Sequence, residues 1–431
     1  MKKNRFDEIG NLNSINGNWD QTLIYKLFSP EWKDSILTQL TGPNNVPVAI
    51  SPYYELLTAE KTTIIELKSI YGYSDIRDNK EEIGSGTVTN NYREYQCNIN
   101  GINSEARLES RQRGRYISGK SSEYGIGVRT NTNNISGDTI LKWGALNDTN
   151  GMYFGVDSDG LFVAILDDGT ENKVYQEDWN IDKMDGTGVS GLTLVLTEAN
   201  IFNIEFTWYG YGVITFKVQV KTEQGMNLLT VHNYIIDNQS SIQNPNLPIT
   251  ATVGQNTNDD DISLFVAGRQ FSILGTYTPT FRSSSEYFIN KSIPTLGTNP
   301  VPILSFKQKE IQRAVDSKLA GMKLVTDNQI IIECYVADES SLNTPNWVNL
   351  TRVDADETAF EVDTESTTFN SNEGNIIYRD IIDGATGNRT NSSDFRDLFV
   401  DIPQNKILVI TGFATETTAS VDGIIRIREE W

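Results

Sequence analysis

The strongest constraint on the fold is a stretch between residues 202 and 220 in which apolar and polar side chains alternate. The apolar positions of this stretch are Phe202, Ile204, Phe206, Trp208, Ile214, Phe216, Val218 and Val220. Successive side chains of a β-strand point to opposite faces, so this spacing predicts two strands that each bury one face. Gly210-Tyr211-Gly212 separates the two strands and predicts the turn of a hairpin.

A second hairpin is predicted between Met152 and Leu166, around the turn Asp157-Ser158-Asp159-Gly160. Gly160 supplies the left-handed backbone conformation that such a turn needs. Repeated hairpins with glycine-rich turns and few helical stretches are typical of β-sandwiches and jelly rolls. We therefore predict an all-β protein with a large jelly-roll or β-sandwich domain and a smaller C-terminal β-sandwich.

Shifts in composition predict four segments along the chain. Residues 1–45 form an N-terminal arm, residues 46–290 the large sandwich, residues 291–303 a proline-containing linker and residues 304–431 the C-terminal β domain. The linker is inferred from Pro294, Pro300 and Pro302 in a polar stretch.

The arm contains one predicted helix, with Ser29 as its N-cap and Pro30 at its first position. Its apolar stripe consists of Trp32, Ile36, Leu37 and Leu40. A short amphipathic helix in a polar arm has no core of its own. The stripe is therefore expected to be buried either on the body of the same chain or on a partner.

The composition excludes several functions. The chain has 57 acidic and 36 basic side chains, a formal net charge of −21, so it repels the phosphate backbone of nucleic acids. No apolar run approaches the roughly 20 residues that span a bilayer. The first residues, Met1-Lys2-Lys3-Asn4-Arg5, are followed by no apolar segment, so synthesis in a cytoplasm is expected.

The residues that most often carry catalysis or bind metals are scarce. His232 is the one histidine, and it lies in a predicted strand. Cys97 and Cys334 are far apart, which favours two buried, unpaired thiols over a disulfide framework or a zinc site. We therefore expect no cofactor and no catalytic residue.

Two kinds of side chain in turns are candidates for ligand binding. Asp157 and Asp159 are weak candidates for calcium, because the loop has no trailing glutamate to complete the ligand set, and turn formation explains the same residues. Tyr209 and Tyr211 flank a glycine turn and are candidates for stacking against a sugar, with bracing of the turn as the alternative.

Arg111, Arg113 and Arg115 alternate along a predicted strand, which would place three guanidinium groups on one face. Such a row can bind carboxylates in a bidentate manner. In so acidic a chain, its expected partners are carboxylates of the same chain or of a neighbouring subunit.

Five segments in a fixed order resemble motifs of virion structural and fibre proteins of tailed phages and giant viruses. They are Ala106–Arg111 with Gly114–Lys120, Trp143–Phe154, Asp182–Gly188 with Ser190–Leu194, Ile201–Gly212, and Asn244–Pro248. This resemblance covers roughly residues 50–310 and implies a concanavalin-like β-sandwich. It implies no catalytic residues.

The resemblance implies a non-enzymatic virion structural protein: a head-fibre, capsid-decoration or tail-fibre component anchored by its N-terminal region. Assembly in the host cytoplasm, contact with other capsid or tail proteins and a homo-oligomer, with a trimer as the first expectation, accompany this hypothesis. The alternatives are an adhesin that binds a host glycan and a polysaccharide depolymerase.

Overall fold

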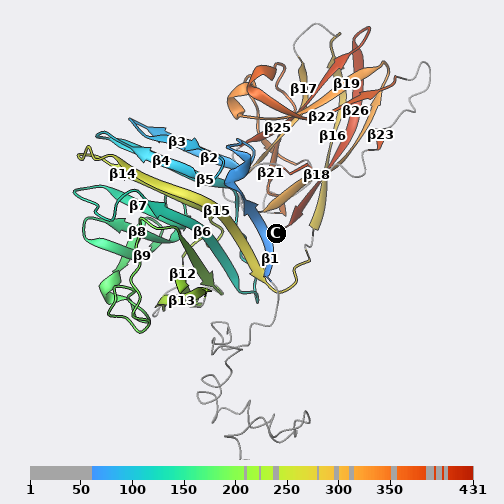
Figure 1. Ribbon diagram of the computed structural model, residues 1–431. Helices are drawn as coiled ribbons and strands as arrows, with labels where there is room; N and C mark the ends of the chain where they lie inside the picture. The colour runs from blue at the N-terminus through green and yellow to red at the C-terminus, as the bar shows by residue number, and fades with distance from the viewer. Residues whose placement is uncertain are drawn as a thin grey trace, which may run out of the picture. The chain divides into compact units, whose positions relative to one another are not determined.

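The protein is described by a computed structural model (Figure 1). The described residues are 61–207, 211–222, 225–235, 242–278, 281–295, 300–309, 315–350, 357–384, 393–394, 400–401 and 406–430. The predicted arm and its helix residues Trp32, Ile36, Leu37 and Leu40 lie outside this range.

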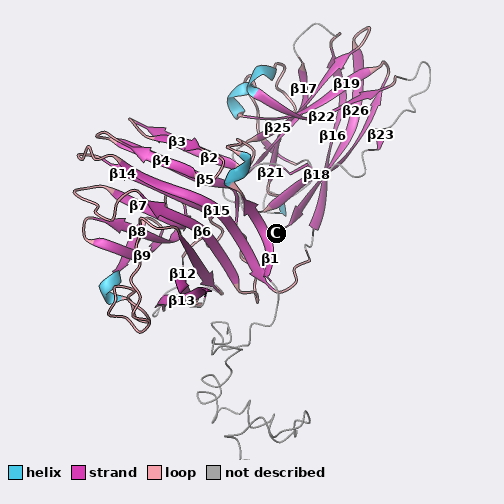
Figure 2. Ribbon diagram, viewed as in Figure 1, coloured by secondary structure: helices cyan, strands magenta, loops and turns pink. Residues whose placement is uncertain are grey.

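Almost all regular structure in the described residues is antiparallel β-sheet (Figure 2). The helical segments are three-residue 3-10 turns: η3 (Ser69–Tyr71), η4 (Gln176–Asp178), η6 (Glu339–Ser341) and η8 (Ser371–Glu373). None of the helices in this part of the chain is long and apolar enough to cross a membrane. The predicted all-β class is confirmed.

The first sandwich consists of an eight-stranded and a seven-stranded sheet. The eight-stranded sheet has the order β13 (Gly225–Tyr234), β12 (Ile214–Thr222), β11 (Asn200–Phe206), β6 (Ser122–Thr130), β15 (Ile262–Leu274), β4 (Tyr95–Ile99) and β3 (Thr87–Asn90), with β1 (Lys61–Leu67) paired to β15. The seven-stranded sheet has the order β10 (Thr170–Tyr175), β9 (Gly160–Asp167), β8 (Gly151–Asp157), β7 (Ile140–Leu146), β14 (Pro248–Gln255), β5 (Ser104–Arg113) and β2 (Asp78–Ile83). Apolar side chains from both sheets form one shared core.

Both predicted hairpins are present in this sandwich. Strands β8 and β9 pair around the turn before Gly160, which has a φ of 126°. Strands β11 and β12 pair with Phe202 opposite Val218 and Ile204 opposite Phe216, all four of them buried. The alternation therefore correctly located the apolar face of the second hairpin, but Asn203 and Glu205 on its polar face are buried as well.

The second sandwich also consists of two sheets around its own core. One sheet has the order β16 (Phe281–Ile293), β26 (Ala419–Glu430), β18 (Asp316–Thr326) and β23 (Ser393–Asp394), with β24 (Val400–Asp401) paired to β18. The other has the order β20 (Val348–Asn349), β21 (Phe360–Asp363), β17 (Val301–Gln308), β25 (Ile407–Ala414), β19 (Ile330–Ala337) and β22 (Gly374–Ile382).

The predicted linker at residues 291–303 is wrong. Strand β16 runs to Ile293 and pairs with β26, so the change from one sandwich to the other lies between Leu274 and Phe281. Pro302 lies inside β17, where the register against β25 shifts between Pro302 and Leu304. Proline is tolerated at such irregularities because the ladder there has an unpaired position, and it therefore does not mark a linker.

One buried ion pair joins the two sheets of the first sandwich. Arg269 of β15 contacts Asp78 of β2 at 2.6 Å, and both side chains are at most 2% exposed. Tyr95 donates its hydroxyl to the same carboxylate at 3.2 Å. Removing one partner would leave the other charge buried without compensation. This costs far more free energy than losing an ion pair at the surface.

Replacing Asp78 by alanine should therefore lower the free energy of unfolding by about 3–5 kcal/mol. Denaturant unfolding followed by tryptophan fluorescence measures this change. The control is Lys80→Ala, which removes an exposed ion pair with Glu82 and should cost less than about 1 kcal/mol. Equal effects of the two substitutions would contradict the role assigned to the buried pair.

Candidate functional site

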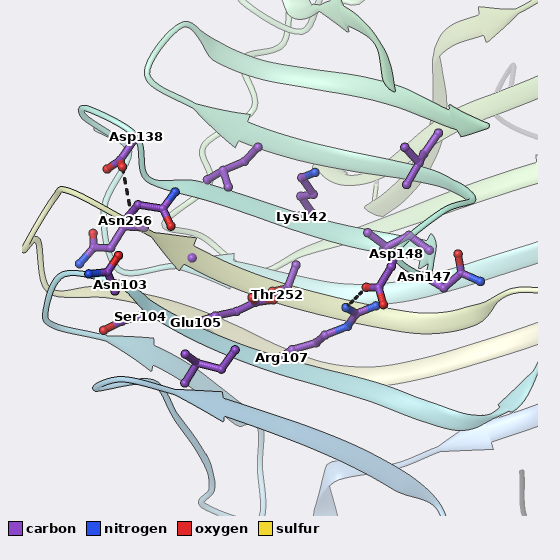
Figure 3. A pocket seen from close by; sticks show the side chains of 16 residues that line it. Asn103, Ser104, Glu105, Arg107, Asp138, Lys142, Asn147, Asp148, Thr252 and Asn256 are labelled. Carbon is purple, nitrogen blue, oxygen red and sulfur yellow. Dashed lines mark hydrogen bonds and ion pairs between the residues drawn. The ribbon is translucent and has the colours of Figure 1, made fainter. Parts of the chain in front are cut away.

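A groove of about 480 Å³ crosses the outer face of the seven-stranded sheet. Strands β5, β14 and β7 form its floor, because their register places Arg107, Thr252 and Lys142 directly opposite one another. Figure 3 shows these three side chains side by side over the strands. The volume falls within the range that holds a small ligand.

The next row of the same three strands is hollow at its centre. Glu105, Gly254 and Ile140 are cross-strand partners there. A Cβ atom on Gly254 would meet its nearest heavy atom, the backbone oxygen of Ser104, at 3.7 Å, which is an ordinary van der Waals contact, so a side chain fits at this position. The absence of a side chain at this position leaves room for a ligand.

Every charged group on the floor has a partner of opposite charge or a hydrogen bond. Arg107 contacts Asp148 at 2.5 Å and Glu109 at 3.2 Å, and Lys142 contacts Glu171 at 2.7 Å. Thr252 donates its hydroxyl to Glu105 at 3.0 Å. Both cations of the floor are therefore paired with carboxylates, and Glu105 accepts a hydrogen bond from a neutral hydroxyl.

Burial raises the pKa of Glu109, and the neighbouring Arg107 guanidinium opposes this shift. The pKa of Arg107 is raised by Glu109 and Asp148, although burial works in the opposite direction. Each charge thus stabilises the other in a poorly solvated place. The pair fixes the position of the Arg107 side chain on the groove floor.

Amide side chains border the groove at both ends. Asn103 and Asn256 lie near Asp138 at one end, and Asn147 lies near Asp148 at the other (Figure 3). Amides and hydroxyls offer both donors and acceptors of hydrogen bonds. The rim is therefore suited to a polar, uncharged ligand.

Asp138 holds the loop after β14 in place. Its carboxylate accepts the backbone N–H groups of Asn256, Thr257 and Asn258 at 3.1, 2.7 and 3.0 Å. These hydrogen bonds, led by that of Thr257, lower the pKa of Asp138. The groove end that contains Asn256 is thus fixed by an ionised carboxylate.

The arginine row does not form as predicted. Strand β5 ends at Arg113, and its register against β14 shifts between Pro248 and Thr250, so regular alternation stops there. Arg111 is 8% exposed and donates to the backbone oxygen of Asp75. Arg113 interacts electrostatically with Glu109, and Arg115 contacts Glu430 at 2.7 Å and also Tyr277. These arginines bind groups of their own chain.

The predicted calcium ligands serve the hairpin turn. Asp157 accepts hydrogen bonds from Lys173 at 2.9 Å and Tyr175 at 3.1 Å, and from the backbone N–H of Asp159. Its carboxylate is therefore neutralised by a lysine. Within the described ranges, no three or more His, Cys, Asp or Glu side chains are grouped so that they could hold a metal ion.

Of the predicted stacking residues, Tyr211 is 76% exposed and Tyr209 lies outside the described residues.

His232 is buried, which lowers its pKa, and its Nδ1 atom accepts the backbone N–H of Asn180. Burial raises the pKa of both Cys97 and Cys334 to about 12, so the two thiols stay protonated.

The sequence does not single out the groove residues as a site. Arg107, Asn147 and Asp148 lie inside two of the quoted motifs, Ala106–Arg111 and Trp143–Phe154. Nothing in the sequence shows that these motifs meet, because the floor depends on pairing with β14, more than 100 residues further along the chain.

No protein-family model matches the chain, and no curated protein matches it. Solved structures show low similarity. A legume lectin-like domain from Entamoeba histolytica is 9% identical over 45% of this chain and 89% of its own, with a TM-score of 0.29. Peanut lectin is 13% identical over 51% and 100%, with a TM-score of 0.33. An endo-β-1,4-glucuronan lyase from the fungus Trichoderma reesei is 10% identical over 50% and 96%, with a TM-score of 0.33. Similarities at this level do not bear on ligand or activity.

The fold and the groove define a two-sandwich β-protein with a polar groove on one outer sheet face.

Folding lowers the pKa of Asp138, so its ionised form stabilises the fold above the unfolded pKa of about 3.9. That stabilisation is lost as the pH falls through the lower, folded pKa. Asp138→Asn should therefore be less stable than the wild type at pH 7, and the difference should shrink toward pH 2. Thermal melting across this pH range measures it. The control, Asp159→Asn in an exposed turn, should melt like the wild type at pH 7. A difference for Asp138→Asn that does not depend on pH would contradict the assignment.

Proposed function

We propose that the protein is a non-enzymatic, glycan-binding surface protein of a virion, and that the groove over β5, β14 and β7 binds the glycan. The observation that carries the glycan proposal is the groove, where both cations of the floor are paired with carboxylates and amides lie at both ends. The hydroxyls of a sugar both donate and accept hydrogen bonds, as this lining does.

The charges of the groove favour an uncharged glycan. Three acidic and two basic side chains line it: Glu105, Asp138, Asp148, Arg107 and Lys142. Both cations already contact carboxylates, and the chain as a whole carries a charge of −21. A uronate or sialate would have to displace one of these pairs against this field, whereas a neutral sugar would not.

The virion part of the proposal is supported by the five motifs that resemble phage and giant-virus structural proteins. The all-β construction and the predicted attachment arm of residues 1–45 suit such a protein. Homo-oligomerisation, with a trimer as the first expectation, and contact with capsid or tail proteins belong to the same proposal.

Gly254→Leu tests the groove. The Cβ atom of the leucine would meet its nearest neighbour, the backbone oxygen of Ser104, at an unstrained 3.7 Å, so the melting temperature should stay unchanged. Binding to neutral glycans on an array should fall at least tenfold. Gly268→Leu is the matched control, because Gly268 also has open space around it and lies on the other sheet. Full binding by Gly254→Leu would refute the groove as the glycan site.

Deleting residues 1–45 tests attachment to the particle. The shortened protein should be soluble and bind glycan like the full chain, but it should no longer join particles when both forms compete during assembly. Quantitative immunoblotting of purified particles measures incorporation. Equal incorporation of both forms would argue against attachment by the arm.

The absence of enzymatic activity is tested with the glycans that bind. Incubation with the full chain should release no reducing ends and no unsaturated products. Release by the wild type that is lost in Gly254→Leu would favour the depolymerase alternative.

A further inference from the structure

Tyr92 has an unusual backbone conformation. Its φ is 65°, in the left-handed region that tyrosine rarely adopts, and its side chain is 69% exposed. An exposed ring contributes little to the core, so packing does not explain why a tyrosine occupies a place where glycine or asparagine would be unstrained. Strained backbone of this kind is retained most often where a side chain has a function.

The turn between β3 and β4 imposes this conformation. Asn90 accepts the backbone N–H of Tyr92 at 2.8 Å, and Asn91 accepts those of Arg93 and Glu94 at 3.0 Å each. The turn closes with a hydrogen bond from Asn91 N–H to the Glu94 carbonyl oxygen. Two asparagine side chains therefore fix the backbone of the turn that carries Tyr92.

A second exposed tyrosine directly precedes the glycine that the Tyr92 ring approaches. Tyr71, in η3, is 64% exposed, and the following residue, Gly72, has a φ of 71°. A Cβ atom on Gly72 would lie 3.6 Å from Cε1 of Tyr92, so the Tyr92 ring lies against the Gly72 backbone. We call Tyr71, Gly72 and Tyr92 the tyrosine platform.

Hydrogen bonds hold the two halves of the platform together. Ser69 donates its hydroxyl to the carbonyl oxygen of Arg93 at 2.5 Å, and Asn90 donates its amide to the carbonyl oxygen of Ser69 at 3.0 Å. Arg77 donates to the carbonyl oxygen of Gly72, and its guanidinium lies 5.8 Å from the centre of the Tyr71 ring. Two aromatic surfaces are thus combined with a cationic hydrogen-bond donor on a fixed support.

We propose that the tyrosine platform binds a sugar ring of the glycan by stacking. This inference rests on the proposed glycan binding and adds a second contact, which shares no residue with the groove. A pyranose presents C–H groups on its face and hydroxyls at its edge. The aromatic faces of the platform suit the C–H groups, and the phenol hydroxyls and the Arg77 guanidinium suit the edge.

The strain gives a sharp test. Tyr92→Gly removes both the ring and the steric conflict, so its melting temperature should equal or exceed that of the wild type, although most substitutions destabilise. Its affinity for glycan should nevertheless fall at least tenfold, and Tyr71→Ser should lose affinity likewise. Tyr287→Ser, at a 44% exposed tyrosine of the second sandwich, is the control and should bind within twofold of the wild type.

The probes are cellohexaose, maltohexaose and N-acetylchitohexaose, added to the full chain in a calorimeter alongside the neutral glycans that bind on the array.

Weaker binding by Tyr92→Gly with undiminished stability supports the platform. Wild-type affinity in Tyr92→Gly, together with loss in Gly254→Leu, would overturn the platform and leave the groove in place. No binding by the wild type to any of these glycans would overturn both proposals. A changed sedimentation coefficient with unchanged glycan affinity would identify the platform as a protein contact and overturn the sugar assignment.

Discussion

The first sandwich depends on one irregularity in its longest strand, β15. In β15, Val266 lies opposite Val128 of β6, and Arg269 lies opposite Ile126, so β15 contains one extra residue. Before this bulge the buried apolar residues of β15 are the even-numbered Ile262, Leu264 and Val266. After it they are the odd-numbered Phe271 and Ile273, and buried Arg269 shares their face. The bulge thus directs Arg269 into the core, where Asp78 of the opposite sheet compensates its charge. An Arg269 directed outward would leave Asp78 buried alone.

Local elements of this fold could be predicted because their causes are local. The β8–β9 hairpin follows from its turn sequence, and the buried face of β11 and β12 follows from alternation. The bulge in β15 is also marked in the sequence by Ala267-Gly268, a small pair inside an apolar strand, which is a usual sign of a bulge. The linker prediction failed for a non-local reason. Whether a proline lies in a strand or in a linker depends on which strand pairs with that segment, and the sequence does not show this pairing.

The sites could not be predicted in the same way, since they are made by pairing between distant segments. Arg107 and Lys142 meet only because both pair with Thr252. The arginine row failed because the regular register between β5 and β14 ends before Arg111, which turns that side chain toward the carbonyl oxygen of Asp75. The strain of Tyr92 is likewise absent from the sequence, where Asn90-Asn91-Tyr92 indicates only a turn.

The net charge of −21 and the charge pairs in the groove both disfavour an anionic ligand. A strongly acidic chain repels anionic ligands at long range, and unpaired cations in a site would be needed to overcome that repulsion. The groove instead pairs Arg107 with Asp148 and Glu109, and Lys142 with Glu171. What remains for recognition is hydrogen bonding and shape, which discriminate between sugars by the direction of their hydroxyls. Such contacts are individually weak, so useful affinity on a particle requires several contacts per glycan or several copies of the protein. The proposed tyrosine platform would supply the first of these, and the proposed homo-oligomer would supply the second.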